Sequence, residues 1–418
     1  MTGSLRIALL IAASAAALGG CAKGKADGAG LSEPTESKPQ AVAPSKPASR
    51  TPVAERSYAP WPVALHDSRH SSAAPVNGPV TGKIAWRRTL EGPVVPGPVV
   101  GRGGVAYAAS NGGVLHALQV SDGGEVWSFD GGGAYGSDLS SSPAILRDGT
   151  ILWPGPGGLF ALDPDGRLLW KEEFGSDVLS PLIGQDGRVY VAEFGGALHA
   201  LDLRGSEPPV RAWTFESQET SYGSPALARD GTVYWTAGRE LIALEDGGDR
   251  ARVRWRFEAQ SLVEVSPAVA PDGTVILGTN DRFQYGIGPD GRERWRYPRE
   301  DITYSSPGVT ADGAVRFGDH RGFLTVLDSA TGKRIARYSG QRRKPGANNV
   351  GIWTAPVVDA QRNVYFGTHP GKLFGFSYEG RKLFEIDTGG VVDSYPALAG
   401  DGTLLAGSES GELLALRD

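Results

Sequence analysis

Several side chains of this chain have the chemistry needed to hold a calcium ion or a carboxylate ligand. Four of them carry oxygen atoms of the kind that Ca²⁺ prefers: Glu264, Asn348, Asn349 and Asp393. Three consecutive cations could neutralise the carboxylates of a small molecule: Arg342, Arg343 and Lys344. The spacing of these residues does not mark a metal site, so the chemistry depends on how the fold places them.

Nucleophilic and zinc chemistry have less support in the sequence. The only cysteine is Cys21, which excludes a zinc site built from several cysteines, and no nucleophile-elbow motif is present. His116 and His199 occupy a strand position that is filled elsewhere by Phe, Ile and Leu, so we expect both to pack in the core. His320 and His369 fall in turns, where we expect them to be exposed.

The three cations lie in the longest segment between repeated units, residues 340–353, which reads GQRRKPGANNVGIW. The net charge of the whole chain is −5, which argues against a general nucleic-acid binder. Two interpretations of this basic loop remain open. It is either a solvated charged loop or a contact for an acidic partner or for lipid headgroups.

The elements that must position these residues follow from an internal repeat. A proline opens each of eight units, at Pro98, Pro143, Pro181, Pro225, Pro267, Pro307, Pro356 and Pro396. An aromatic residue ends each of eight units, at Trp86, Trp127, Trp170, Trp213, Trp255, Trp295, Tyr338 and Phe384. Both series recur at intervals of roughly 40 to 49 residues, a period that is typical of four-stranded propeller blades.

Within a unit, the pattern predicts four short strands joined by tight turns. An Asp-Gly pair, such as Asp272-Gly273, follows the first strand and predicts a hairpin, because both residues tolerate a positive φ. The third strand alternates a large and a small side chain, as in His116 and Ala117, on opposite faces of the sheet. We expect the small residue to leave room for the terminal aromatic ring of an adjacent blade.

The two ends of the repeat predict how the ring closes. The last unit stops at ELLALRD and lacks a fourth strand, whereas GKIAW at residues 82–86 reads as a fourth strand without the preceding three. We therefore predict an all-β, eight-bladed β-propeller of four-stranded antiparallel blades. Its ring is closed by an N-terminal strand, residues 82–88, that pairs with the last blade and removes exposed sheet edges.

The segments between a terminal aromatic and the next proline are the longest and most variable, and such loops are where binding sites gather. The positions three residues before each proline are Val95, Ser140, Val178, Tyr222, Glu264, Tyr304, Trp353 and Asp393. Five of these could form a partner-binding rim of aromatic and acidic groups around the central channel: Tyr222, Glu264, Tyr304, Trp353 and Asp393. The alternative is a solvated rim that packs only for stability.

The N-terminal region predicts export and a lipid anchor. Residues 1–21 join a cation, an apolar run and LGGC, an arrangement that resembles the signal peptide and lipobox of bacterial lipoproteins, with lipidation at Cys21. Residues 22–57 contain few large apolar side chains and are predicted to be a disordered tether. Residues 58–418 are predicted to form the propeller. We expect the protein to be anchored in the outer membrane, facing the periplasm.

The chain from Trp61 onward resembles the quinoprotein-alcohol-dehydrogenase-like propellers, which are built from PQQ-type repeats. LDPDGRLLW at residues 162–170 and LDSATGKRIARY at 327–338 carry the tryptophan-docking pattern of that family. WPVALHDSRHSS, which begins at Trp61 and includes His66 and His70, is similar to the family's lead-in segment. Tyr338 replaces the usual tryptophan in one unit. The resemblance is specific for the fold and weak for function, since one fold hosts many activities.

The lipoprotein signal and the tether favour the non-catalytic BamB-type branch of this family. The resemblance therefore implies a non-enzymatic, protein-binding scaffold of the cell envelope that aids outer-membrane protein assembly. It implies envelope proteins as partners, among them an outer-membrane β-barrel assembly factor, and no cofactor. It implies a monomeric propeller. Two alternatives stay open. One is a PQQ-dependent dehydrogenase of alcohols or sugars, which would hold PQQ with Ca²⁺. The other is a carbohydrate- or peptide-binding sensor propeller.

Overall fold

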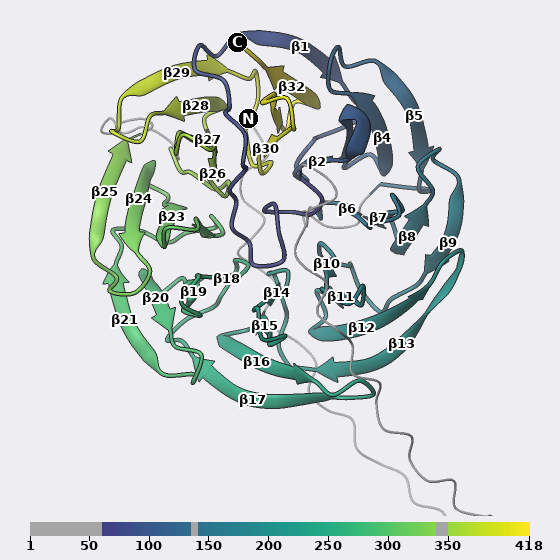
Figure 1. Cartoon of the computed structure of the whole chain (residues 1–418), viewed down its shortest axis with the longest axis vertical. Coiled ribbons are helices and arrows are strands. Elements are labelled where there is room, and N and C mark those ends of the chain that lie inside the picture. Colours follow the sequence, from purple (N-terminus) through teal and green to yellow (C-terminus); the bar gives the residue numbers. More distant parts are fainter. Residues whose placement is uncertain (1–60, 135–140, 340–349) are drawn as a thin grey trace, which may run out of the picture. The chain divides into compact units, whose positions relative to one another are not determined.

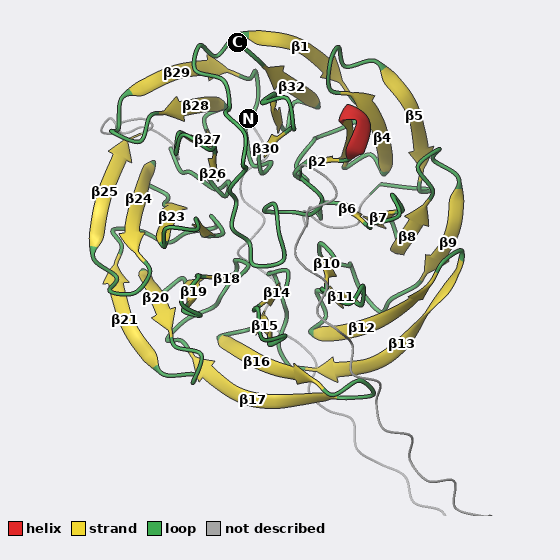
Figure 2. Cartoon of the chain, viewed as in Figure 1, coloured by secondary structure: helices red, strands yellow, loops and turns green. Residues whose placement is uncertain are grey.

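The computed structural model describes residues 61–134, 141–339 and 350–418, which form a ring of eight sheets around a central axis (Figure 1). Strands and loops make up nearly all of these residues, and their single helical element is the 3-10 turn Arg102–Gly104 (Figure 2). None of their helices is long and apolar enough to cross a membrane. The predicted all-β, eight-bladed architecture is confirmed.

We number the blades I to VIII, and each is an antiparallel meander of four strands. Blade I contains β2 (Val99–Val100), β3 (Val105–Ser110), β4 (Val114–Gln119) and β5 (Glu125–Asp130). Blade II contains β6 (Ala144–Ile145), β7 (Ile151–Gly155), β8 (Gly158–Leu162) and β9 (Leu168–Glu172). Blade III contains β10 (Leu182–Ile183), β11 (Val189–Ala192), β12 (Ala197–Arg204) and β13 (Glu207–Glu216). Blade IV contains β14 (Ala226–Leu227), β15 (Val233–Ala237), β16 (Glu240–Asp246) and β17 (Ala251–Glu258).

The remaining four blades complete the ring. Blade V contains β18 (Ala268–Val269), β19 (Val275–Gly278), β20 (Phe283–Ile287) and β21 (Glu293–Pro298). Blade VI contains β22 (Gly308–Val309), β23 (Ala314–Gly318), β24 (Phe323–Asp328) and β25 (Arg334–Ser339). Blade VII contains β26 (Val357–Val358), β27 (Val364–Thr368), β28 (Lys372–Phe376) and β29 (Lys382–Asp387). Blade VIII contains β30 (Ala397–Leu398), β31 (Leu404–Gly407), β32 (Glu412–Leu416) and β1 (Ile84–Thr89).

Burial changes from the inner strands to the outer strand of each blade. The second strands, such as Val364–Thr368, are buried along nearly their whole length because similar sheets cover both of their faces. The fourth strands form the outer circle in Figure 1 and alternate between covered and exposed residues, as in Lys382–Asp387. The core is therefore divided among the interfaces between neighbouring blades.

Blade VIII closes the ring as predicted, because β1 supplies its fourth strand. β1 pairs antiparallel with β32, with Trp86 opposite Ala415 and Thr89 opposite Glu412. The pairing continues beyond the strands through a hydrogen bond from the Leu90 N–H to the Gly411 carbonyl, at 2.8 Å. Residues from the two ends of the propeller thus share one sheet, and no blade of the described chain is left with three strands.

The terminal aromatics dock one blade on the next, and Trp295 shows how. On one side its ring covers Gly286 of its own blade, where an added Cβ would lie 2.1 Å from Cε2. On the other side it covers Gly332 of blade VI, and its indole N–H donates to the Ser329 carbonyl at 2.7 Å. The prediction that the small third-strand residue accommodates a neighbour's ring is wrong, because Gly286 is the cross-strand partner of Trp295 itself.

The same docking contact recurs around the ring, but at one joint the acceptor is a carboxylate and not a backbone carbonyl. The indole N–H groups of Trp86, Trp127 and Trp255 donate to backbone carbonyls of the following blade at 2.8–2.9 Å, and the Tyr338 hydroxyl donates to the Tyr378 carbonyl at 3.0 Å. Trp213 instead donates to a carboxylate, Asp246 Oδ1, at 2.9 Å. The joint between blades III and IV therefore contains a buried charge.

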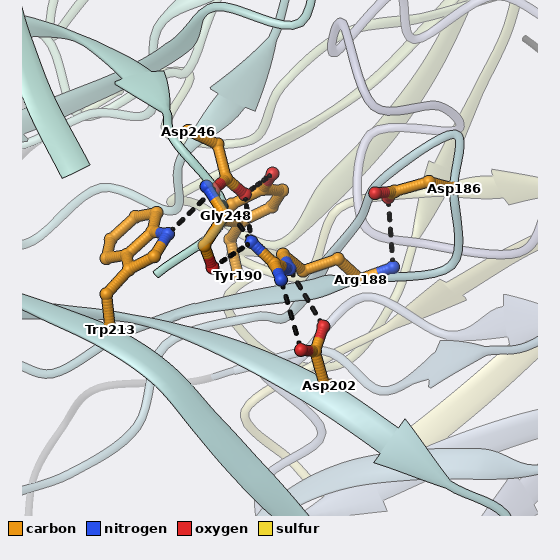
Figure 3. A network of polar contacts seen from close by, with 7 residues as sticks. All are labelled: Asp186, Arg188, Tyr190, Asp202, Trp213, Asp246 and Gly248. Atoms are coloured by element: carbon orange, nitrogen blue, oxygen red, sulfur yellow. Dashed lines mark hydrogen bonds and ion pairs between the residues drawn. The ribbon is translucent and has the colours of Figure 1, made fainter. Parts of the chain in front are cut away.

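That carboxylate belongs to a polar network around Arg188, whose side chain is only 6% exposed (Figure 3). The Arg188 guanidinium donates to Asp202 of its own blade at 2.9 and 3.0 Å and to Asp246 of blade IV at 2.7 and 2.8 Å. The Tyr190 hydroxyl also donates to Asp246, at 2.7 Å. With Trp213, five side chains from two blades satisfy one another's hydrogen bonds. A buried ion pair is tolerated under this condition.

The lead-in segment, residues 61–76, crosses the middle of the ring (purple in Figure 1). Its backbone carbonyls accept hydrogen bonds from the first strands of five blades. The donors are the N–H groups of Val100, Ile145, Leu227, Val269 and Val358, at 2.7–2.9 Å. Four residues of the segment that are not glycine have a positive φ: Leu65, His66, His70 and Ser72. Residues with a positive φ that are not glycine persist only where the surrounding structure holds them in place, so the lead-in segment is an integral part of the folded ring.

The repeated Ser-Pro motif has a structural role at the inner ends of the blades. The Ser142 N–H donates to Ser180 Oγ at 2.9 Å, and the Ser224 N–H donates to Ser266 Oγ at 3.0 Å. The Ser266 N–H in turn donates to Ser306 Oγ at 3.1 Å. Serines that directly precede a proline thus bond blade II to III, IV to V and V to VI, which gives the repeated motif a structural role.

Candidate functional site

Two sets of turns form one face of the ring, which we call the rim face. It contains the connections from each fourth strand to the next first strand and the turns between second and third strands, because antiparallel strands reverse direction at every turn. Backbone hydrogen bonds join the two sets. Three of them run from Asn280 N–H to the Leu262 carbonyl (2.9 Å), from His320 N–H to Ile302 (3.2 Å) and from His369 N–H to Gly351 (2.8 Å).

Glycines at the ends of second strands let the rim loops approach closely. A Cβ added to Gly318 would lie 2.4 Å from Ile352 Cγ2, and one added to Gly367 would lie 2.2 Å from Val392 Cγ1. Ile352 and Val392 each immediately precede a predicted rim residue, Trp353 or Asp393. The close approach therefore fixes where the side chains of the rim lie.

Four aromatic rings and a carboxylate form what we call the rim cluster: Tyr304, His320, Trp353, His369 and Asp393. The His320 ring stacks on Trp353 with centroids 5.2 Å apart, and the His369 ring stacks on the same indole at 4.3 Å. Tyr304 makes edge contacts with His320 at 4.8 Å and with Trp353 at 5.2 Å. The expectation that both histidines are exposed is wrong, because stacking on Trp353 leaves them half-buried.

Polar atoms of the rim cluster lack hydrogen-bond partners among the described residues. These atoms are Trp353 Nε1, His320 Nε2, His369 Nδ1 and Asp393 Oδ1. Burial lowers the pKa of His320 to about 4, so this ring is neutral near pH 7. Asp393 lies 3.9 Å from His369, which is too long for a hydrogen bond. All four unpaired atoms are buried among neighbouring side chains, so the cluster holds polar groups whose hydrogen bonds are not made within the described residues.

The other predicted rim residues extend the cluster along the rim face. The Tyr222 ring lies edge-on to Phe194 at 5.1 Å, and Glu264 accepts a hydrogen bond from the Asn280 side chain. Burial raises the pKa of the Tyr304 hydroxyl, and the nearby Glu264 carboxylate adds to this effect. The structure thus brings the five predicted rim residues onto one face, whereas Val178 at the equivalent position is buried.

Sequence reasoning missed three members of this surface, namely Phe194, His320 and His369. A signal was present for the two histidines. Gly278-Thr279-Asn280, Gly318-Asp319-His320 and Gly367-Thr368-His369 align as the same turn after the second strand. Aligning these turns beside the loops that precede the prolines would have placed both histidines on the rim.

Other predicted residues lie elsewhere or outside the described ranges. His116 and His199 are buried as expected, and each also faces a glutamate: His116 Nε2 lies 2.7 Å from Glu91, and His199 Nε2 lies 2.6 Å from Glu193. Seven predicted residues fall outside the described ranges: Cys21, Ser140, Arg342, Arg343, Lys344, Asn348 and Asn349. The tether at residues 22–57 is outside them as well.

A small cavity of about 50 Å³ lies on the axis beside the rim face. Nine residues line it: Ala64, Leu65, Ser141, Leu179, Ser180, Tyr222, Ser224, Ser266 and Tyr395. Tyr222 also belongs to the rim, while Ala64 and Leu65 come from the lead-in segment. None of the nine side chains carries a charge at neutral pH.

The fold family implies PQQ with Ca²⁺, and this cavity does not fit that cofactor. Cofactor-sized ligands occupy pockets of about 300–1,000 Å³, far above the volume present, and a tricarboxylate requires cations that the lining lacks. In the part of the chain that the structure describes, no group of three or more His, Cys, Asp or Glu residues could hold a metal ion. Glu264 and Asp393, the two described members of the predicted oxygen set, bond to or face Asn280 and His369 instead.

A closed ring of eight meander blades, docked through terminal aromatics and lined by Ser-Pro strands, defines a β-propeller of PQQ-type repeats. Comparison with known proteins refines this class. A family model described as outer membrane protein assembly factor BamB matches residues 76–138, 136–208 and 210–418. The chain belongs to this family.

Individual relatives match over shorter stretches. Outer membrane protein assembly factor BamB of Burkholderia pseudomallei (strain K96243) is 30% identical over 118 residues, 28% of this chain and 29% of the relative. The protein of the same name from Yersinia pestis is 30% identical over 140 residues, 30% of this chain and 35% of the relative. The chain thus matches about a third of the length of these relatives.

Solved structures share the fold at low sequence identity. BamB from Moraxella catarrhalis superposes with a TM-score of 0.61 at 18% identity, over 80% of this chain and 99% of that one. Quinohemoprotein alcohol dehydrogenase from Comamonas testosteroni gives a TM-score of 0.65 at 14% identity, over 85% of this chain and 80% of that one. BamB and a quinohemoprotein alcohol dehydrogenase therefore match this backbone about equally well, and the fold does not separate them.

Proposed function

We propose that this protein is a non-enzymatic scaffold of the bacterial cell envelope that aids outer-membrane protein assembly by binding a partner protein through its rim face. The observation that carries the proposal is the rim cluster, where stacked, half-buried aromatic rings lie together on the rim face beside the Asp393 carboxylate. Interfaces are enriched in such aromatic anchors. Membership of the BamB family and the names of its relatives support the biological setting.

The proposal includes a lipid anchor at Cys21 that holds the propeller at the outer membrane, facing the periplasm. The sequence before Cys21 supports it, as described above. In Cys21→Ala, we expect the protein to move from the membrane pellet to the soluble fraction, because no acyl chain can be attached. Fractionation followed by immunoblotting measures this. A variant that stays fully in the membrane pellet would contradict the anchor.

Crosslinking in the cell tests the rim face directly. A photoreactive amino acid at Glu264 is expected to capture a partner that mass spectrometry identifies as an envelope protein. The same amino acid at Arg229 serves as the control, because Arg229 is exposed in the turn between β14 and β15 on the opposite face. Equal capture of the same partner from both positions would contradict a rim-specific site.

Trp353→Ala is expected to reduce partner capture from Glu264 about tenfold or more, because central aromatic anchors carry most of the binding energy of an interface. Tyr378→Ala is the matched control: this aromatic is 44% exposed and lies between β28 and β29 on the opposite face. We expect Tyr378→Ala to leave capture unchanged. Thermal melts of both variants show whether a loss of capture reflects binding or unfolding.

The two alternative functions have distinct outcomes. A PQQ-dependent dehydrogenase would bind the quinone with Ca²⁺ stoichiometrically and oxidise alcohols or sugars with a dye as acceptor. A carbohydrate- or peptide-binding sensor would bind its ligand without turnover and capture no assembly protein. Turnover with bound quinone would overturn the scaffold proposal.

A further inference from the structure

The axial cavity is surrounded by hydroxyl groups. Six of its nine lining residues carry one: Ser141, Ser180, Tyr222, Ser224, Ser266 and Tyr395. They lie one to three residues before the prolines that open blades II, III, IV, V and VIII. The apolar floor is made by Ala64 and Leu65 of the lead-in segment.

Some of these hydroxyls already form hydrogen bonds between blades, and those bonds determine whether a hydroxyl can still donate to a ligand. Ser180 Oγ and Ser266 Oγ already accept backbone N–H groups from the preceding blades, at 2.9 and 3.0 Å. Their hydroxyl hydrogens have no acceptor among the described residues, and the Ser224 hydroxyl makes no hydrogen bond to any of them. A serine hydroxyl has one hydrogen to donate. The cavity therefore has hydroxyl hydrogens without acceptors, which a ligand with an acceptor atom would satisfy.

The uncharged lining and the small volume of the cavity restrict the class of ligand further. The nine lining residues include no Lys, Arg, His, Asp or Glu, so a charged group would enter without a counter-ion. The volume of about 50 Å³ has room for roughly three or four water-sized groups, taking about 10–15 Å³ for each. A carboxamide has three heavy atoms, no charge and a strong acceptor oxygen.

We propose that the axial cavity binds a carboxamide, as presented by an asparagine or glutamine side chain at the tip of a partner loop. Its carbonyl oxygen accepts hydrogen bonds from the serine hydroxyls, and the stem of the side chain passes Tyr222 to reach the rim face. The origin of the group in a partner loop rests on the proposed function, whereas the preference of the cavity for a carboxamide does not. The site gives the rim face a specificity pocket at its centre.

Saturation-transfer NMR on the purified full-length protein tests the site with acetamide as the probe. We expect saturation transfer to acetamide, with a dissociation constant on the order of 1–10 mM for so small a ligand. Acetate and methylammonium, which are similarly small but charged, are expected to show none. Ser224→Val fills the cavity and removes one donor, so acetamide binding should weaken about tenfold or more.

Two further variants keep the test decisive. Ser121→Val is the matched control, because Ser121 is exposed in the turn between β4 and β5 and should leave acetamide binding unchanged. Ser224→Ala removes the hydroxyl alone and serves if the valine variant fails to fold. Equal saturation transfer to acetamide in the wild type and in both Ser224 variants would overturn the site. Binding of acetate as strong as that of acetamide would overturn it too, as would a cavity that holds only water. Crosslinking from Glu264 is independent of this assay, so a failure of either proposal can be recognised separately.

Discussion

Deleting residues 22–90 is expected to turn the propeller into a protein that aggregates or is cleaved early by proteases. The deletion removes β1, which leaves the outer edge of β32 unpaired and open to other strands. It also removes the lead-in segment, whose carbonyls bond the first strands of five blades. Thermal melts and limited proteolysis measure the effect. If this protein melts like the full-length chain, the role of β1 in closing the ring is wrong.

Three companion variants separate the effect of ring closure from the effect of shortening the chain. Deleting residues 22–55 leaves every described residue in place, so we expect an unchanged melting temperature. Trp86→Ala keeps β1 but empties its docking site over Gly123, and should cost about 3–5 kcal/mol, as for other buried tryptophans. Trp170→Ala, in the middle of the array, should cost a similar amount, because the two side chains are 9% and 5% exposed. A much smaller loss for Trp86→Ala would mean that the closing blade frays.

Asp246→Ala is expected to destabilise the propeller by about 3–5 kcal/mol, the usual cost of breaking a buried ion pair from one side. The substitution leaves the buried Arg188 guanidinium bonded to Asp202 and the Gly248 carbonyl, and it removes the acceptor of the Tyr190 hydroxyl and the Trp213 indole. Urea denaturation of the purified protein measures the change in the free energy of unfolding. A loss below about 1 kcal/mol, typical of surface pairs, would show that water replaces the network.

Acid should weaken the same joint. Burial alone would raise the pKa of Asp246, but hydrogen bonds from Arg188, Trp213 and Tyr190 outweigh it and hold this pKa below the ordinary 3.8. The stabilisation is therefore complete above about pH 4 and is lost as the pH falls below that value. The control is Glu258→Ala, because Glu258 pairs with Arg239 at the surface, where both side chains are more than half exposed. This variant should keep the acid sensitivity of the wild type, whereas Asp246→Ala should lose part of it.

The internal repeat was enough to predict the propeller architecture, but it predicted the candidate site only in part. Eight prolines, eight terminal aromatics and an unpaired fourth strand near the N-terminus were enough to predict the blades and the closure by β1, because each sheet can bury its faces only against copies of itself. The five rim residues could be chosen by register, since the position three residues before each proline is equivalent in every blade. The stacking of His320 and His369 on Trp353 was not predicted, because the repeat sets a residue's position within its blade but not its contacts with the next loop.

The number of blades, the order of their strands and the face that carries the variable loops can all be read from the sequence, since they follow from a periodic pattern of local turns and strands. The contacts across blades emerge only in the folded ring. The lead-in segment crosses the axis, Arg188 bonds carboxylates from two blades, and Trp353 lies between histidines of blades VI and VII. Such contacts join residues that are distant in the chain, and they depend on the distance between neighbouring sheets in the closed ring. A local pattern carries no information about that distance.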